Sequence, residues 1–234
     1  MQRVVTPELM DDPGVDRGEL RRSLAYIRAV NRWLGGWSML ERWLNAWRGE
    51  LSTGPVTLLD IATGSADLPV RAVAWAKARG VDLRVTAVDV HEGTLDEARR
   101  HVDEAGAGEH IDVVKADAFE LVDRFGVGSF DIVHAGLFVH HLRELPAMTM
   151  LAAMDRLSRH GLVWNDLMRT RIGYAAIHVM TLGQPKIVRH DACVSVRAGF
   201  ALREAKSMAV RADWHEPKLV SNFLTHRFSI GSWR

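Results

Sequence analysis

The sequence has little cysteine and no long apolar run. Its single cysteine among 234 residues, Cys193, cannot form an internal disulfide, which is compatible with a reducing cytosol. No apolar run approaches the ~20 residues that a membrane-spanning helix needs. The polar start "MQRVVTPELMDDPGVDRGEL" also lacks the apolar core of a signal peptide. We therefore expect a soluble, cytoplasmic protein with no membrane span.

An excess of charge of one sign is absent as well. Lysine and arginine total 30, aspartate and glutamate total 29, and the formal net charge is +1. A nucleic-acid partner usually requires a basic excess on one face of a domain, so we expect no nucleic-acid partner. The 47% hydrophobic and 25% charged residues are ordinary values for a globular domain.

The first fifty residues carry a helical pattern. Apolar residues at three- and four-residue spacing predict two helices over 18–51, separated at Gly35-Gly36. Four of the eight tryptophans lie here, at Trp33, Trp37, Trp43 and Trp47. Such aromatic stripes usually pack a helix onto a protein body, and the alternative is a lid over an apolar substrate. We expect residues 1–50 to form a helical extension or lid and 51–234 the main body of a single domain.

From residue 56 onward, short β-branched runs alternate with helical segments. The predicted strands are 56–62, 83–90, 111–118, 130–136 and 161–167, and the predicted helices between them are 66–80, 93–106 and 144–159. This alternation is typical of right-handed crossovers and of a parallel sheet covered on both faces. The predicted fold class is a doubly wound, Rossmann-like α/β fold.

The last third of the chain is less regular. Residues 170–186 and 201–209 have helical patterns, and 187–200 suggest a loop. The tail, 210–231, predicts two closing strands that pair antiparallel. The expected sheet has seven strands and is mostly parallel, with the last strand antiparallel.

The first strand runs into a glycine turn in "VTLLDIATGSADLP" (56–69). A glycine lets the backbone approach a ligand, and the helix that follows offers free N–H groups. In the G-x-G-x-x-G turn of dinucleotide enzymes, the three glycine positions would fall on Ala62, Gly64 and Asp67. A carboxylate at Asp67 would repel a pyrophosphate and suits an ammonium or sulfonium group. The turn therefore argues against NAD.

Aspartates recur where the first three predicted strands end. Asp60 ends the first, Asp89 ends the second, and Asp117 follows the third. Asp89 is suited to accept hydrogen bonds from two ribose hydroxyls, and Asp117 is placed to accept one from an adenine amino group. One such aspartate alone is common in turns and helix caps, whereas three at successive strand ends indicate a nucleoside-containing ligand.

These motifs resemble the class I S-adenosylmethionine-dependent methyltransferases. "LLDIATGSADLP" is similar to their first motif, Asp-x-Gly-x-Gly, and "VTAVDV", "KADAF" and "FDIVHAGLFVHHL" are similar to the next three, over roughly residues 50–170. The resemblance implies S-adenosylmethionine as cofactor and S-adenosylhomocysteine as product. The implied binding residues are Asp60, Ala62, Thr63, Gly64, Asp67, Asp89, Val90, Asp117, Ala118 and Gly136. Ala62 replaces the first family glycine, and we expect weakened cofactor binding, with inactivity as the alternative.

Further segments narrow the resemblance. "ATGSADLP", "HHL", "NDLMRTRIGY" and "RHDACVSVRAGF" are similar to bacterial small-molecule methyltransferases of polyketide and phenolic-lipid pathways. The implied function is O-methylation of a phenolic or polyketide-derived hydroxyl on a small, partly apolar acceptor. A homodimer is left open.

Methyl transfer to a phenol requires that the hydroxyl lose its proton, which a neutral histidine can take. We expect His141 to be the base and His140 to orient or pack. The alternative is that one histidine caps the next helix while the other lines the pocket.

Three further residues, Tyr26, His190 and Arg169, are candidates for contact with the substrate, and each has an ordinary packing or surface role as its alternative. His190 would gain a fixed tautomer from Asp191. Arg32 is a candidate for binding the cofactor's carboxylate, with a surface position as its alternative.

A metal site is not expected. The resemblance to cation-dependent catechol methyltransferases would require an Asp-Asn pair and a further aspartate at the end of strand four. Asn165-Asp166 supply a pair, but His134-Ala135-Gly136 stand at strand four, so an oxygen-rich Mg²⁺ site is incomplete.

Three rival functions stay open. A C-methyltransferase of the quinone type would use the same histidine to deprotonate a ring hydroxyl. A non-catalytic binding module is favoured by Ala62. An RNA or protein methyltransferase is disfavoured, because "HAGLF" replaces the Asn-Pro-Pro-Tyr type of fourth motif.

Overall fold

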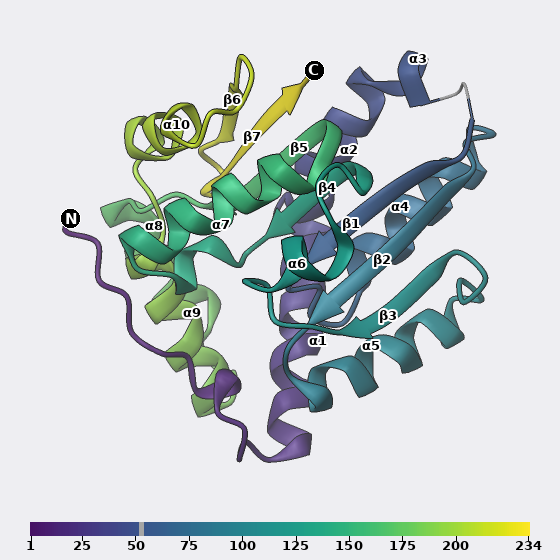
Figure 1. Cartoon of the computed structure of the whole chain (residues 1–234). Coiled ribbons are helices and arrows are strands. Elements are labelled where there is room, and N and C mark those ends of the chain that lie inside the picture. The colour runs from purple at the N-terminus through teal and green to yellow at the C-terminus, as the bar shows by residue number, and fades with distance from the viewer. Residues whose placement is uncertain (52–53) are drawn as a thin grey trace.

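The computed structural model describes residues 1–51 and 54–234 and contains one seven-stranded sheet (Figure 1). The strands are β1 Val56–Ile61, β2 Leu83–Asp89, β3 Ile111–Lys115, β4 Phe130–Gly136, β5 Ser158–Leu167, β6 Lys218–Asn222 and β7 Arg227–Trp233. Their order is β3-β2-β1-β4-β5-β7-β6, with β1 to β5 parallel and β7 antiparallel to both neighbours. The predicted fold class and the antiparallel last strand are confirmed.

Helices cover both faces and one end of the sheet (Figure 1). They are η1 Leu9–Asp11, α1 Arg17–Trp33, α2 Gly36–Ala46, α3 Arg48–Leu51, α4 Asp67–Lys77, α5 Glu92–Glu104, α6 Leu121–Phe125, η2 Val139–His141, α7 Glu144–Leu157, α8 Arg171–Met180, α9 Lys186–Ala198 and α10 Leu202–Arg211. Among the described residues, none of these helices has the length and apolar character needed to cross a membrane.

Two hydrophobic cores lie on opposite faces of the sheet. Because successive side chains of a strand point to opposite faces, Leu58 packs toward α2, α4 and α5, whereas Leu59 packs toward α7 and α10. Both leucines are 0–1% exposed. The strands therefore read as nearly continuous apolar runs, as expected of a parallel sheet covered on both sides.

The order of the strands reverses between β1 and β4. The chain passes outward from β1 to β2 and β3, then returns to place β4 on the other side of β1. Asp60 of β1 and His134 of β4 are direct partners in this parallel pair. In open α/β sheets, ligands bind beyond the carboxyl ends of the strands at such a reversal.

The tryptophan-rich helix α2 is held by aromatic packing. Trp47 lies between Trp43 and Trp233, with ring centroids 5.7 and 4.9 Å away. The indole N–H of Trp43 donates to the hydroxyl of Ser229 at 2.8 Å. Trp33, in contrast, is 71% exposed. Trp43 and Trp47 thus attach the extension to the sheet, in agreement with the packing interpretation.

The prediction of a loop at 187–200 was wrong, because most of this segment forms the helix α9. Ile187, Val188 and Val196 are buried on one side of that helix. Its valines, serine and aspartate lower the intrinsic helix propensity, but contacts with α1, α8 and η1 stabilise the helix. The helices expected near 170–186 and 201–209 and the two C-terminal strands are confirmed.

Candidate cofactor and acceptor site

The turn after β1 is built around the carboxylate of Asp60. This buried group accepts a hydrogen bond from the Thr63 hydroxyl at 2.6 Å and lies 2.5 Å from Nδ1 of His134. Gly64 has φ +58° and Ala62 has φ +53°, both in the left-handed region. Glycine adopts this region freely, whereas alanine does so at a cost of about 1 kcal/mol. A glycine at position 62, as in the family motif, would therefore relieve backbone strain as well as remove a methyl group.

The acidic group at the end of β2 is tied to the same turn. The carboxylate of Asp89 accepts hydrogen bonds from the backbone N–H groups of Gly64 at 3.1 Å and His91 at 3.0 Å. Burial raises the pKa of Asp89, and the two hydrogen bonds oppose that rise. Each carboxylate oxygen keeps a free lone pair, so the group can still accept hydroxyls from a ligand.

Asp67 begins α4 and is buried at the strand ends. Its Oδ1 accepts from the side-chain amide of Asn31 at 3.4 Å, and its Oδ2 has no hydrogen-bond partner. Burial raises the pKa of this carboxyl, and the neighbouring Asp60 adds to the rise. An unpartnered buried acceptor of this kind is suited to a cationic ligand group.

These residues line one cavity at the carboxyl ends of β1, β2 and β4, which we call the cofactor cavity. It brings together ten of the residues singled out from the sequence, namely Asp60, Ala62, Thr63, Gly64, Asp67, Asp89, Val90, Gly136, His140 and His141. Gly136 must be small, because a Cβ there would lie 2.8 Å from Cε1 of His134.

Three of the expected cofactor residues lie outside this lining. Asp117 is exposed, and its carboxylate accepts from the backbone N–H of Phe119 at 2.9 Å. Ala118 follows it on the same surface turn. Arg32 is exposed, with its guanidinium 4.8 Å from the ring of Trp33.

The two histidines of η2 are each held by a carboxylate. Nδ1 of His140 lies 2.7 Å from Asp166, and Nδ1 of His141 lies 2.9 Å from Asp11. Burial by itself would lower the pKa of His140, but Asp166 and Glu8 raise it to about 10. Burial is likewise outweighed at His141, where Glu8 and Asp11 raise the pKa. The catalytic and orienting roles expected of His141 and His140 stay predictions.

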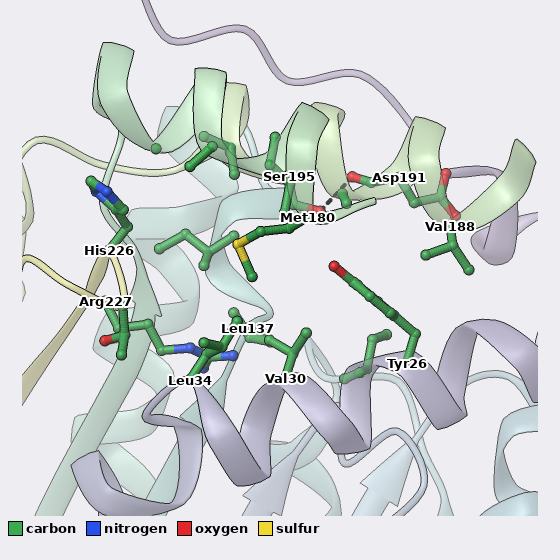
Figure 2. A pocket seen from close by; sticks show the side chains of 18 of the residues that line it. Tyr26, Val30, Leu34, Leu137, Met180, Val188, Asp191, Ser195, His226 and Arg227 are labelled. Carbon is green, nitrogen blue, oxygen red and sulfur yellow. Dashed lines mark hydrogen bonds between the residues drawn. The ribbon is translucent and has the colours of Figure 1, made fainter. Parts of the chain in front are cut away.

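A second, mostly apolar cavity adjoins the first, and we call it the acceptor cavity (Figure 2). Its apolar wall comes from α1, α8 and α9 and includes Ile27, Val30, Leu34, Ile177, Met180 and Val188. Tyr26 also lines it, with a buried hydroxyl that has no hydrogen-bond partner. Glu8, Met10, Ile27, Leu137, Leu167 and Ser195 line both cavities, so the two are continuous.

A buried arginine stands in the wall of the acceptor cavity. Arg227 is 1% exposed, donates to the side-chain oxygen of Asn31 at 3.0 Å, and leaves Nε and Nη1 without partners. Burial lowers its pKa to about 10, against the opposing charges of Asp166 and Asp67. Asn31 therefore bridges a charged group of each cavity, Asp67 in one and Arg227 in the other.

Two expected substrate residues lie apart from both cavities. The His190 ring faces Asp191 at 2.9 Å, as the sequence suggested, but His190 opens onto a surface groove with Cys193 and Arg189. Arg169 donates to the backbone carbonyls of Met1 and Gly199 and to the carboxylate of Glu204.

Sequence reasoning missed several residues of the two cavities. Glu8 and Asp11 lie in a polar segment without periodicity, and Arg227 begins a strand that was placed only approximately. His134 was considered only because it stands near the strand end where a metal-binding aspartate would be needed. Its position near the end of β4 could have marked it as a cavity residue. For Glu8 and Asp11 we find no local signal in the sequence.

Comparison with known proteins agrees with this geometry. Residues 58–161 match the family model described as a methyltransferase domain. The matched segment is less than half of the 234 residues, and the sheet order and the strand-end cavity agree with the fold of class I S-adenosylmethionine-dependent methyltransferases. No curated protein matches the sequence.

Solved structures share the fold at low sequence identity. A candidate O-methyltransferase from Nostoc punctiforme superposes with TM-score 0.67 and 15% identity, covering 100% of this chain and 64% of its own. A magnesium protoporphyrin IX methyltransferase from Synechocystis with bound S-adenosylhomocysteine gives 0.60 and 16%, covering 86% and 83%. A methyltransferase from Aquifex aeolicus gives 0.61 and 14%, covering 94% and 98%. The chain thus spans just under two thirds of the Nostoc protein.

Proposed function

We propose that this protein transfers the methyl group of S-adenosylmethionine to a hydroxyl of a small, partly apolar acceptor, phenolic or polyketide-derived. The observation that carries the proposal is the continuity of the two cavities. A polar cavity at the β1–β4 reversal meets an apolar cavity under α1, α8 and α9, and six residues line both. Such an arrangement suits a charged cofactor placed end to end with an apolar acceptor.

In this proposal the cofactor lies across the ends of β1 and β2. The ribose hydroxyls bind the carboxylate of Asp89, and the ammonium group of the methionine portion binds the unpartnered oxygen of Asp67. Gly64 and Gly136 leave room for the backbone to approach the ligand. The adenine end extends toward the exposed turn at Asp117 and Ala118, whereas Arg32 lies outside the lining of both cavities.

The acceptor lies against the apolar wall of Figure 2. Its reacting oxygen faces His140 and His141, which line the cofactor cavity at the junction. Holding this oxygen in line with the sulfonium methyl supplies much of the acceleration in such a displacement. The phenolic proton must also leave, and the sequence assigns its removal to His141.

The distal end of the acceptor carries a carboxylate or a comparable acceptor group. The support for this is Arg227, whose Nε and Nη1 are buried without partners in the cavity wall. A buried guanidinium gains most from a planar anion that takes two hydrogen bonds. Tyr26 offers a further hydroxyl to the same ligand.

Residues 1–50 are proposed to cover both cavities. Glu8, Met10 and Asp11 and the inner face of α1 form part of their walls. Figure 1 shows the N-terminal segment passing along α9. A cytoplasmic location and the absence of a nucleic-acid partner stay proposals drawn from the single cysteine and the balanced charge.

The first test is isothermal titration with S-adenosylmethionine and S-adenosylhomocysteine, with NAD as the decoy. Micromolar binding of the first two and none of NAD is expected. The protein is then incubated with phenols and the cofactor carrying a ¹³C-labelled methyl group. An O-methyl carbon shift in the product supports the proposal, a C-methyl shift selects the quinone-type rival, and cofactor binding without turnover of any phenol selects the binding module.

The acceptor cavity has its own pair of variants. Val30→Trp fills the cavity from α1, whereas Ala29→Trp adds the same side chain at an exposed position of the same helix. Val30→Trp is expected to raise KM for the phenol at least tenfold with an unchanged cofactor Kd. Ala29→Trp is expected to change neither constant.

A further inference from the structure

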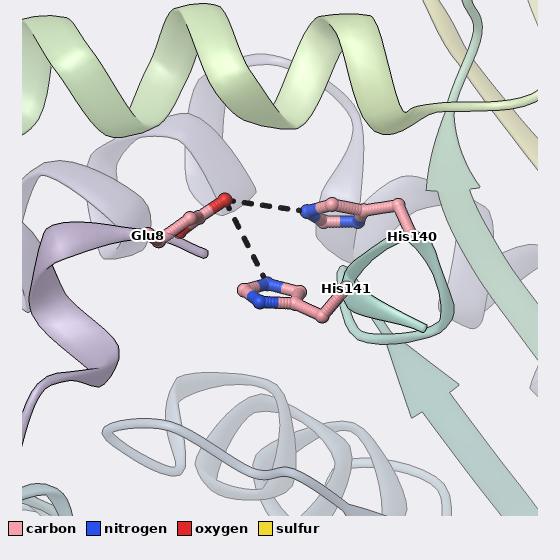
Figure 3. A group of neighbouring side chains, drawn as sticks. All are labelled: Glu8, His140 and His141. Atoms are coloured by element: carbon pink, nitrogen blue, oxygen red, sulfur yellow. Dashed lines mark ion pairs between the residues drawn. The ribbon is translucent and has the colours of Figure 1, made fainter. Parts of the chain in front are cut away.

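Three side chains converge at the junction of the two cavities (Figure 3). Oε1 of Glu8 lies 3.6 Å from Nε2 of His140 and 3.7 Å from Nε2 of His141. The three ligand atoms all lie within 4.8 Å of one another. Glu8 comes from the segment before η1 and the histidines come from η2, so tertiary packing alone brings them together. We call these three residues the Glu8 cluster.

The outer nitrogen of each imidazole is fixed by a carboxylate. Nδ1 of His140 lies 2.7 Å from Asp166, and Nδ1 of His141 lies 2.9 Å from Asp11. When Nδ1–H donates to a carboxylate, the neutral ring presents the lone pair of Nε2 on its other side. Both Nε2 atoms of the Glu8 cluster face the same carboxylate, and a bound metal ion would take the place of the protons that the raised pKa values keep on these rings. Metal-binding histidines in proteins are oriented by the same kind of carboxylate partner.

The inner nitrogen of His140 is unsatisfied. His140 is 2% exposed, and its Nε2 has no hydrogen-bond partner. The 3.6 Å separation from Glu8 is too long for a hydrogen bond. Buried polar atoms without a partner are rare, so this nitrogen indicates a ligand that enters the cluster.

The spacing of the cluster fits a metal ion. A divalent ion bound at about 2.1 Å by nitrogen and oxygen ligands separates them by roughly 3.0–3.4 Å. The two separations from Glu8, 3.6 and 3.7 Å, exceed this range by a few tenths of an ångström, and the three ligand atoms all lie within 4.8 Å of one another. Two imidazoles and one carboxylate also form the ligand set of zinc sites that leave a position open for water or substrate.

We propose that Glu8, His140 and His141 bind a divalent ion of the zinc type, with an open position facing the cavity junction. Mg²⁺ and Ca²⁺ are not the expected ions, since both prefer all-oxygen ligand sets. This differs from the expectation of no metal drawn from the sequence, which weighed Asn165-Asp166 and did not include Glu8. The ligand set here comes from other residues.

The role of the ion rests on the proposed function. The acceptor hydroxyl binds at the open position, where the ion lowers its pKa and its proton passes to water. The oxygen then attacks the methyl carbon, and a C–O bond forms as the C–S bond breaks. The electron pair of that bond returns to sulfur and gives S-adenosylhomocysteine. His141 is then a ligand and not the base.

The test uses the full-length protein without a histidine tag. The protein is stripped with a chelator, titrated with Zn²⁺ by calorimetry, and separately loaded with Co²⁺ for visible absorption. One Zn²⁺ per chain with a submicromolar Kd, a Tm that rises with Zn²⁺, and cobalt bands typical of nitrogen ligation are expected. A stripped protein that takes up no stoichiometric Zn²⁺ overturns the proposal.

The variants separate ligands from bystanders. Glu8→Gln keeps the size of the side chain and is expected to weaken Zn²⁺ binding at least tenfold, as is Asp11→Asn, which only orients His141. Asp12→Asn changes an exposed acid of the same segment and is expected to leave Zn²⁺ affinity unchanged. Wild-type Zn²⁺ affinity in Glu8→Gln overturns the assignment of ligands.

The metal and the methyl transfer can fail separately. If the stripped protein binds S-adenosylmethionine and methylates a phenol at the full rate, the metal proposal falls and the proposed function stands. If the protein binds Zn²⁺ at the Glu8 cluster but does not bind S-adenosylmethionine, the proposed function falls and the metal site stands.

Discussion

The carboxylate of Asp89 accepts a hydrogen bond from the backbone N–H of Gly64 at 3.1 Å. This contact ties the acidic end of β2 to the glycine turn after β1. A ligand that binds the carboxylate of Asp89 at one end would therefore also stabilise the glycine turn, which faces the other end of the ligand. The two sequence motifs act as one unit of the cofactor cavity.

The first prediction follows from that contact. Asp89→Ala removes the acceptor for the ribose and releases Gly64, and we expect cofactor affinity to fall about 10- to 100-fold, or about 1.4–2.8 kcal/mol. Asp89→Asn keeps one oxygen and should lose less. Titration calorimetry measures both. Equal affinity in wild type and Asp89→Ala would place the ribose elsewhere.

The second prediction concerns the left-handed alanine. Ala62→Gly removes a methyl group from the cavity wall at φ +53°, and we expect cofactor affinity to rise by up to about tenfold. The free energy of unfolding should stay within about 1 kcal/mol, because the relief of strain is offset by the greater freedom of glycine in the unfolded chain.

A matched control for this variant is Asp213→Gly. Asp213 has φ +61° and lies after α10, outside both cavities. Its replacement should affect unfolding similarly and leave cofactor affinity unchanged. A fall in affinity on Ala62→Gly would show that the methyl group supports the cofactor instead of crowding it.

The third prediction is a pH dependence at Asp67. Burial raises the pKa of this carboxyl in the folded protein, so the folded state holds its proton to higher pH than the unfolded chain. The contribution of Asp67 to stability therefore falls as pH rises from about 4 through the raised value. Asp67→Asn lacks this titration, and its stability advantage over wild type should grow across that window to roughly 1 kcal/mol.

Urea denaturation at a series of pH values measures this difference. Asp117→Asn, the same substitution at an exposed position, is the matched control. At neutral pH, Asp67→Asn should also weaken cofactor binding about tenfold, because the ammonium group loses a charged partner. A variant less stable than wild type at every pH would mean that the carboxylate is stabilised in a way the folded contacts do not show.

The fourth prediction tests Arg227 as the anion-binding group of the acceptor cavity. Wild-type enzyme should have a KM about tenfold lower for a phenolic acid than for its methyl ester. Arg227→Met, which keeps the length of the side chain, should abolish that preference. Circular dichroism and the cofactor Kd verify that the variant is folded. A wild type that treats acid and ester alike would contradict this role.

Much of the fold could be predicted because its signals are local. Alternating apolar runs such as 56–62 and 83–90 predicted strands buried on both faces. The glycine turn with Asp60, Gly64 and Asp67 predicted the end of the sheet at which a ligand binds. The segment 187–200 was misread, since α9 depends on its contacts with α1, α8 and η1 more than on propensity.

The sequence by itself determined the sheet and its ligand-binding edge, because side-chain periodicity and turn chemistry act over a few neighbouring residues. The proposed cofactor class came from the resemblance of its motifs to a family. Only the tertiary structure decided that Glu8 meets His140 and His141 and that Arg227 is buried beside an apolar cavity. These contacts join residues far apart in the chain. They arise when the N-terminal segment packs on α9 and β7 pairs between β5 and β6. Such packing leaves no periodic pattern in the sequence of the residues that it brings together.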